Sequence, residues 1–354
     1  MWNRILISIL TLMAFCQCAR ESDNKQISLD DIGISEYPNI TELILQNPDT
    51  IFEFKKDYPV ALRVIDDAII VTKIHSDSAI IIIDKKSGKP LFNIGLVGIG
   101  PKDVLMPRML NNPIVSNSKE LIMTDVNAGK LLRLNITDGN INQTPLPKYM
   151  RGMAYINLFS DKMVASKVGN TDNMFMIYNI SENSSHDVKF PFELSEDNIN
   201  MLGTGLQTFM SSNIFANEEK DRIISSMYYF DIYNVFDFNG NLKRCVSLGS
   251  ESIDINKSIE NIFSGQEFWR YSIGFATNED CWLKRIKNRA DLNKDETITL
   301  SQQLIKTDWE GIPSAVYQLP NDLLNFCIDN GCLYGIINQI NNDNESYYII
   351  RWNL

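Results

Sequence analysis

Short apolar runs separated by polar turns fill the chain from about residue 50 to its end. The runs are rich in Ile, Val, Leu, Phe and Tyr, and the breaks between them are rich in Gly, Asn and Asp. Runs of this composition between such breaks are typical of β-strands. Only the stretch 253–263 resembles a helix. The pattern therefore predicts an all-β protein with one short helix.

Two landmarks recur in alternating order along these runs. The first is a polar turn that leads into an apolar strand, at 66–71, 119–123, 161–165, 221–225, 279–283 and 330–334. The second is an apolar strand that ends at Asp or Asn before a turn, at Asp84, Asn135, Asn179, Asp237, Asp308 and Asn353. Copies lie roughly 50 residues apart, which suits a blade of four strands. Six copies of each landmark predict a six-bladed β-propeller.

The last copy ends with the chain at Asn353, so its blade lacks an outer strand. Two strand-like segments, 41–45 and 50–54, stand before the first unit. We expect one of them to complete the last blade, because an unpaired strand edge is a liability that ring closure removes. The expected blades are 60–100, 105–147, 150–193, 205–249, 268–320 and 322–354 with the N-terminal strand.

The N-terminus predicts export. A positive start with Arg4 leads into the apolar run 5–15, which is shorter than the ~20 residues of a membrane-spanning helix and fits a secretory signal. The cysteines that follow, before a polar stretch, resemble the lipobox of bacterial lipoproteins. We place the lipid on Cys18 rather than Cys16, because Phe15 is too bulky for the cleavage point. An ordinary secreted protein with incidental cysteines is the alternative.

The predicted organisation is a signal peptide at 1–17, a lipid-anchored tether at 18–36 and a single propeller domain at 37–354. The predicted location is the cell envelope, as an outer-membrane lipoprotein that touches the membrane through its lipid alone. We expect a monomer.

The segment 96–103 carries a sharper motif. Gly98, Gly100, Pro101 and Asp103 resemble the G-x-G-P-x-[DE] turn of NHL-like and TolB-like six-bladed propellers, most closely those of Bacteroidota lipoproteins, although Lys102 replaces the usual Gly. The resemblance implies a fold and an exported location, and it brings no catalytic residues. We expect the two glycines to supply backbone freedom and Pro101 to end the outer strand.

Composition narrows the function. The net charge of −11 argues against nucleic-acid binding, which needs a basic surface. Four cysteines beyond the leader permit two disulfides in an exported protein. Cys327 and Cys332 bracket a hairpin signal, across which we expect them to face one another. The spacing of the four cysteines is unlike that of zinc ligands, so we expect neither a structural zinc site nor a cofactor. These cysteines are Cys245, Cys281, Cys327 and Cys332.

Three arginines stand at matching offsets before the first landmark of blades two, three and five. They are Arg108, Arg151 and Arg270. The offset predicts that they surround the channel mouth, where guanidinium groups would bind a carboxylate, sulfate or phosphate. Trp269 and Tyr271 flank the last arginine and could stack on a sugar or another ring. The alternative is that the arginines are blade-edge residues paired with local acids.

Other features are weaker. Asp291, Asn293 and Asp295 have the spacing of a calcium loop but lack its later Gly and Glu, which favours a solvated hairpin loop. The aromatic run 228–233 is expected to pack between blades. The inter-blade segments 192–206 and 249–269 should lie on one face, where propeller loops contact partners.

Three functions remain open. The first is a binding module for a glycan, a peptide or an envelope partner. The second is a lactonase-like or lyase-like enzyme that uses a metal in the channel, and the third is a purely structural envelope component. No P-loop, nucleophile elbow or dinucleotide motif is present in the sequence. We favour the binding module over the enzyme, because no acid cluster can be assigned to the channel.

Overall fold

The computed structural model describes residues 40–55, 57–98, 100, 103–113, 119–169, 172–249, 254–291, 296–320, 323–341 and 344–354. The predictions for the signal peptide, the Cys18 lipid and the tether lie outside these ranges. In the described part of the chain, no helix is both long and apolar enough to cross a membrane.

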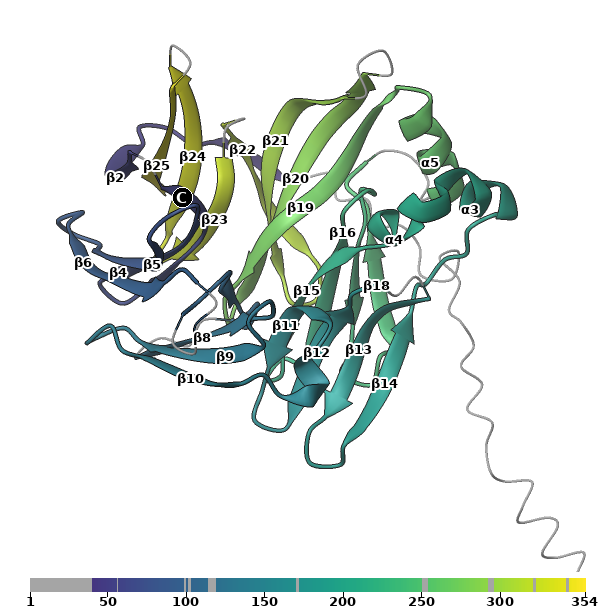
Figure 1. The fold of residues 1–354 in the computed structure, drawn as a ribbon. Helices are drawn as coiled ribbons and strands as arrows, with labels where there is room; N and C mark the ends of the chain where they lie inside the picture. The colour runs from purple at the N-terminus through teal and green to yellow at the C-terminus, as the bar shows by residue number, and fades with distance from the viewer. Residues whose placement is uncertain are drawn as a thin grey trace, which may run out of the picture.

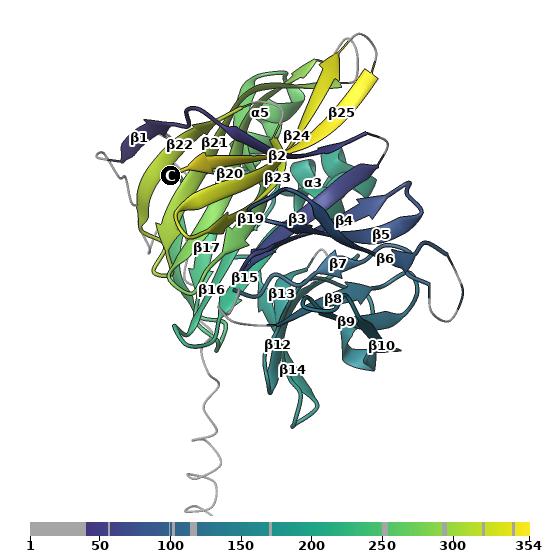
Figure 2. The same cartoon turned by 90° about the vertical axis from the view of Figure 1, so that its left-hand side faces the viewer.

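The described chain forms a six-bladed β-propeller, as the repeat predicts (Figures 1 and 2). Each blade has four antiparallel strands, which in the first five blades follow chain order from the central channel outward. The innermost strands are β3 (Tyr58–Ile65), β7 (Arg108–Met109), β11 (Met153–Leu158), β15 (Ser212–Asn217), β19 (Glu267–Ala276) and β23 (Leu323–Asp329). The second strands are β4 (Ala68–Ile74), β8 (Glu120–Asp125), β12 (Lys162–Lys167), β16 (Arg222–Met227), β20 (Asp280–Asp291) and β24 (Cys332–Asn341).

The outer half of each blade consists of a third strand and a fourth strand. The third strands are β5 (Ser78–Asp84), β9 (Lys130–Asn135), β13 (Asn173–Asn179), β17 (Tyr233–Phe236), β21 (Glu296–Asp308) and β25 (Asn344–Asn353). The fourth strands are β6 (Pro90–Leu96), β10 (Ile141–Pro145), β14 (Ser184–Lys189), β18 (Leu242–Val246), β22 (Pro313–Leu319) and, in blade six, β2 (Asp49–Phe54).

The N-terminal strand closes the ring. β2 pairs antiparallel with β25, the last strand of the chain, and Asp49 forms an ion pair with Arg351 across this pairing. Phe54 at the end of β2 is buried in the core shared by blades five, six and one. The second candidate segment also forms a strand, because β1 (Thr41–Ile44) adds to the edge of blade five, parallel to β22.

Both sequence landmarks are turns with a physical cause. The first is the turn between a blade's innermost and second strands, where Asp66, Asp221 and Asn330 adopt a positive φ, a conformation that Asp and Asn tolerate well. The second landmark begins the turn between the third and fourth strands. There the side chain of an Asp or Asn accepts backbone N–H groups of the turn, as Asp84 does from Ser87.

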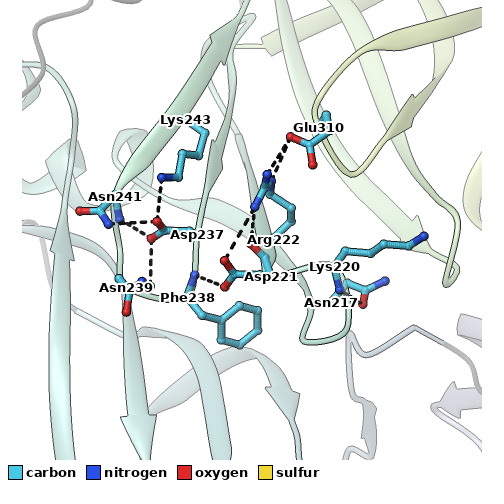
Figure 3. A network of polar contacts seen from close by, with 10 residues as sticks. All are labelled: Asn217, Lys220, Asp221, Arg222, Asp237, Phe238, Asn239, Asn241, Lys243 and Glu310. Carbon is cyan, nitrogen blue, oxygen red and sulfur yellow. Dashed lines mark hydrogen bonds and ion pairs between the residues drawn. The ribbon is translucent and has the colours of Figure 1, made fainter.

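Blade four shows both turns together (Figure 3). Burial alone would raise the pKa of Asp237, but Lys243 and the N–H groups of Asn239 and Asn241 lower it to about 2. Asp221 accepts the backbone N–H of Phe238 and thereby links the two turns. The recurring acids therefore fix turns rather than form a site.

The longer inter-blade segments gather into a helical cap beside blades four and five (Figure 1). The cap contains α3 (Glu196–Leu202), the 3₁₀ turn η2 (Gly203–Gly205), α4 (Leu206–Phe209) and α5 (Ile255–Phe263). A further 3₁₀ turn, η1 (Lys148–Met150), precedes β11. Ser195 caps α3 and Asp254 caps α5. The sequence predicted α5, whereas α3 and α4 were not anticipated.

Cys245, Cys281, Cys327 and Cys332 are free thiols. The hairpin places Cys332 opposite Asp329 and Cys327 opposite Tyr334. The expectation that Cys327 and Cys332 face one another is therefore wrong, because the two-residue turn lies at Asn330 and Gly331, one position further along the chain than that pairing needs. Burial raises the pKa of Cys327 to about 12, which keeps this thiol protonated.

Candidate functional site

The innermost strands enclose two cavities along the channel. The first, called the mouth cavity, has a volume of about 270 Å³ and lies where these strands begin. Its lining includes Val60, Arg63, Lys73, Arg108, Asn111, Tyr155, Asn213, Tyr228, Gly274 and Asn325. The second, called the far cavity, measures about 340 Å³ and lies where the strands end. Because every blade contributes to the mouth cavity, it exists only in the closed ring.

The mouth cavity is cationic. Its lining contains Arg63, Lys73 and Arg108 and, among the described residues, no carboxylate. Lys73 is almost fully buried and forms an ion pair with Asp57, with 2.7 Å between Nζ and Oδ2. This pairing neutralises Lys73, so Arg63 and Arg108 carry the local positive charge. This local positive charge contrasts with the net charge of −11 of the whole chain.

Arg63 lies at the junction of the two cavities and lines both. It is 8% exposed; Nη1 donates to the Leu62 carbonyl at 3.0 Å, and its guanidinium lies 5.0 Å from the ring centre of Phe275. No ion pair joins Arg63 to a carboxylate in the described ranges. Burial lowers the pKa of Arg63 from its ordinary value. A buried cation without a carboxylate is costly unless an anion binds to it.

Arg108 of blade two lines the mouth cavity, whereas Arg270 of blade five is not among its lining residues. Burial raises the pKa of Tyr228, and Tyr155 adds to the rise, whereas the charges of Arg270 and Arg108 act in the opposite direction. The charges of both guanidiniums therefore act on Tyr228, which lines the cavity. Arg270 Nε donates to the amide oxygen of Asn288 at 2.8 Å once that amide is oriented to accept.

The other candidates lie elsewhere. Arg151 is exposed after the 3₁₀ turn η1, away from the residues that line either cavity. Tyr271 is fully buried against Tyr233, so its ring is not available for stacking on a ligand. The ring of Trp269 lies 4.0 Å from the guanidinium of Arg285, which in turn binds Asp231 through two hydrogen bonds. The aromatic side chains beside Arg270 thus pack within and between blades four and five.

A chain of hydroxyl groups borders the mouth cavity. The hydroxyl oxygens of Tyr155 and Tyr228 lie 2.6 Å apart, and the Tyr228 hydroxyl donates to Asn213 Oδ1 at 3.0 Å. Tyr155 has a φ of +52° at an irregularity in the pairing of β11 with β12. A left-handed backbone at an aromatic residue is strained, and such strain concentrates at functional sites.

Asparagines on the innermost strands join neighbouring blades around the channel. Asn157 of blade three donates to the Ile214 carbonyl at 3.0 Å and accepts the N–H of Ala216 at 3.1 Å, both in blade four. Asn112, Asn217 and Asn325 make comparable bonds to blades three, five and one. These bonds connect neighbouring blades around the channel, and such support helps to preorganise a binding site.

The motif turn positions Arg108. The N–H of Gly100 donates to Asp103 Oδ2 at 2.8 Å, and Lys130 Nζ donates to the carbonyls of both residues. Beyond it, Asp125 accepts the N–H groups of Leu105 and Met106, which directs the chain toward Arg108 in the channel. Pro101 lies outside the described residues.

The reason for the two glycines differs from the one predicted. Neither Gly98 nor Gly100 has a positive φ. A Cβ would lie 2.3 Å from Asp103 Oδ2 at Gly98 and 2.7 Å from it at Gly100. The motif therefore needs space for the carboxylate of Asp103, not unusual backbone angles.

The calcium hypothesis stays untested. Asn293 and Asp295 lie outside the described residues, and the side chain of Asp291 is not described. Within the described ranges, no group of three or more His, Cys, Asp or Glu could hold a metal ion.

The fold is also found in solved structures. No family model and no curated protein sequence matches the chain. A member of the DUF4221 family from Bacteroides vulgatus superposes with a TM-score of 0.56 at 12% identity, covering 90% of this chain and all of that one. An inferred exported protein from Bacteroides fragilis gives a TM-score of 0.47 at 13% identity, covering 89% and 95%. At these identities the likeness establishes the propeller fold alone.

Sequence reasoning missed Arg63, Lys73 and Tyr155, and it assigned Tyr228, within the aromatic run 228–233, to packing between blades. Arg63 had a usable signal, since it is a single charged residue inside an apolar innermost strand just before the first landmark. Tyr155 had none, because its partner Tyr228 is 73 residues away and the two meet only in the folded ring.

Proposed function

We propose that this chain is an exported binding module that holds an anionic ligand in the mouth cavity. The observation that carries the proposal is Arg63, a buried guanidinium that faces a cavity without any carboxylate among its described lining residues. Arg108 and Arg270 add positive charge at the entrance. A guanidinium in such a position binds carboxylate, sulfate or phosphate groups through two parallel hydrogen bonds.

The size of the cavity limits the ligand. Its volume of about 270 Å³ is just below the range of about 300–1,000 Å³ for drug-sized ligands. The mouth cavity therefore suits one small unit, such as a terminal sugar or a single side chain of a larger glycan, peptide or envelope partner. The rest of that partner would lie over the helical cap and the neighbouring loops.

Calorimetry and thermal melting with sulfate, phosphate, acetate and D-glucuronate test this proposal. A ligand at 100 times its Kd should stabilise the fold by about 2.7 kcal/mol. Replacing Arg108 and Arg270 together by Gln should weaken binding by at least about tenfold, because charged hydrogen bonds contribute more than neutral ones. Arg222→Gln is the matched control, since Arg222 pairs with Glu310 beside the turns of blade four (Figure 3). Equal binding by the double variant, or no binding of any anion, contradicts the proposal.

Export and lipidation form a separate part of the proposal. We expect the mature protein to begin at a diacylated Cys18 and to fractionate with the outer membrane. Mass spectrometry of the N-terminal peptide checks this, and an unmodified terminus beyond residue 18 contradicts it. A Cys18→Ala variant should move the protein from the membrane fraction to the soluble fraction.

A further inference from the structure

The hydroxyl chain beside the mouth cavity has only one consistent direction. Asn213 Nδ2 donates to the Ser272 carbonyl, which fixes the amide so that its Oδ1 faces Tyr228. An amide oxygen can only accept, so Tyr228 uses its single hydrogen on Asn213. The hydrogen between the two tyrosines must then come from Tyr155.

This direction determines what Tyr155 offers to the cavity. Its hydrogen is committed to Tyr228, and its oxygen keeps lone pairs on a residue that lines the cavity. Tyr155 is therefore an obligate acceptor: it binds a hydroxyl or N–H donor of a ligand and rejects a group that can only accept. A site that fixes one partner in this way discriminates strongly, because a mismatched ligand leaves a polar group unpaired.

The acceptor stands beside the cationic groups. Arg63 and Arg108 line the same cavity as Tyr155, and the charge of Arg270 acts on Tyr228. We infer that the ligand carries a donor hydroxyl next to its anionic group, as in a sugar acid or a sugar phosphate. This inference rests on the proposed function and specifies its ligand class; bare anions and anions without hydroxyl groups should bind more weakly.

The strained backbone agrees with this assignment. Tyr155 has a φ of +52° where the register of β11 shifts between Ala154 and Asn157. Asn157 is held by its two bonds to blade four, so the shift re-aims Tyr155 toward Tyr228.

Calorimetry of the full-length protein tests the inference with four probes. They are D-glucuronate, D-glucose 6-phosphate, cyclohexanecarboxylate, which lacks hydroxyl groups, and sulfate. We expect D-glucuronate or D-glucose 6-phosphate to bind at least about tenfold more tightly than either hydroxyl-free anion. Whichever of D-glucuronate and D-glucose 6-phosphate binds more tightly identifies the anionic group as a carboxylate or a phosphate.

Tyr155→Phe should reduce that preference to about twofold or less while leaving the affinity for cyclohexanecarboxylate unchanged, because only the donor contact is lost. Tyr149→Phe is the matched control, since Tyr149 stacks on Tyr178 and lines neither cavity. Melting temperatures of both variants verify that they fold.

Single-fluorine analogues of the better sugar provide the sharpest readout. Fluorine cannot donate, so replacement of one particular hydroxyl should weaken binding by about tenfold in the wild type. The same replacement should have no effect in Tyr155→Phe. In Tyr228→Phe it should be tolerated better than in the wild type, because the hydrogen of Tyr155 is released and can point to the fluorine.

The outcomes separate the two proposals. If sulfate, cyclohexanecarboxylate and the sugars bind equally well, the mouth cavity is an anion site and the acceptor inference is wrong. If the hydroxyl preference survives unchanged in Tyr155→Phe, the inference is also wrong. If none of the anions binds, the proposed function fails and the inference fails with it.

Discussion

At the scale of single residues, the molecule buries a charged side chain although its desolvation costs free energy. Arg63 is buried at the junction of the two cavities. In the described structure it contacts one carbonyl and one aromatic ring but forms no ion pair. Natural proteins keep such a group when it performs a function that a hydrophobic side chain cannot. Stability and binding should therefore respond in opposite directions when Arg63 is replaced.

Arg63→Met should raise the free energy of unfolding of the ligand-free protein by about 1–2 kcal/mol, because a buried charge is replaced by a flexible apolar side chain of similar length. The same variant should lose anion binding. Urea denaturation and calorimetry measure the two effects. A loss of stability together with full binding contradicts the role assigned to Arg63.

The glycine motif leads to a second prediction at this scale. Gly98→Ala should lower the free energy of unfolding by about 1–3 kcal/mol, because the new Cβ overlaps Asp103 and the turn must shift. Gly205→Ala is the control, since a Cβ there meets nothing within 4 Å and the backbone is already right-handed helical. Adding Asp103→Ala to Gly98→Ala should recover part of the loss. Equal stability of the two glycine variants would show that space at Asp103 is not the reason for the motif.

At the scale of elements, two devices hold the ring together: β2 completes blade six, and asparagines join neighbouring innermost strands. β2 contributes Phe54 to the largest core cluster, whereas β1 adds a largely exposed edge strand to blade five. β2 should therefore contribute far more to the stability of the fold than β1.

Phe54→Ala should reduce the free energy of unfolding by about 3–5 kcal/mol, the usual effect of emptying a buried aromatic site. Ile44→Ala on β1 is the matched control, because Ile44 is 73% exposed, and it should stay within about 0.5 kcal/mol of the wild type. Chemical denaturation of both variants measures these changes in the free energy of unfolding. Similar effects of the two substitutions would contradict closure by β2.

Asn157→Ala should lower the free energy of unfolding by about 2–4 kcal/mol, because it breaks two hydrogen bonds between blades and leaves the N–H of Ala216 unpaired. The exposed Asn142 on β10 serves as the control. If Asn157→Ala matches the Asn142→Ala variant, the asparagine bonds do not hold the blades together.

The blades could be predicted because their signals are local. A turn Asp or Asn identifies a strand pair within a few residues, so the six units and the closing strand follow from the sequence alone. The site could not be predicted in this way, because Arg63, Tyr155 and Tyr228 come from blades one, three and four and become neighbours only around the channel. Arg108 was found by its offset before the first landmark of blade two, whereas the matching offset in blade three leads to Arg151, which lies in a solvent-exposed turn.

At the scale of the whole molecule, the two ends of the channel differ in charge. The mouth cavity is lined by Arg63 and Arg108, besides Lys73, which Asp57 neutralises. The far cavity is lined by Glu219 and Arg63, and by Glu120 and Glu218, which pair with Arg133 and Lys162. A field of this polarity attracts an anion at one end and repels it at the other. An anionic ligand should therefore enter by the mouth cavity and reach Arg63 from that side.

Val60 and Glu219 allow this direction to be tested, because each lines one cavity only. Val60→Glu places a carboxylate among the cations of the mouth and should weaken anion binding by about tenfold or more through competition and repulsion. Glu219→Lys reverses a charge at the far end and should change the affinity by less than about twofold, because solvent screens exposed charges across the channel. Calorimetry with D-glucuronate and sulfate compares the two variants, and their melting temperatures show whether both remain folded. A larger effect of Glu219→Lys would mean that the ligand enters where the innermost strands end. Arg63, which borders both cavities, would then be reached from the acidic side, and the cations of the mouth would have to be explained by something other than ligand capture.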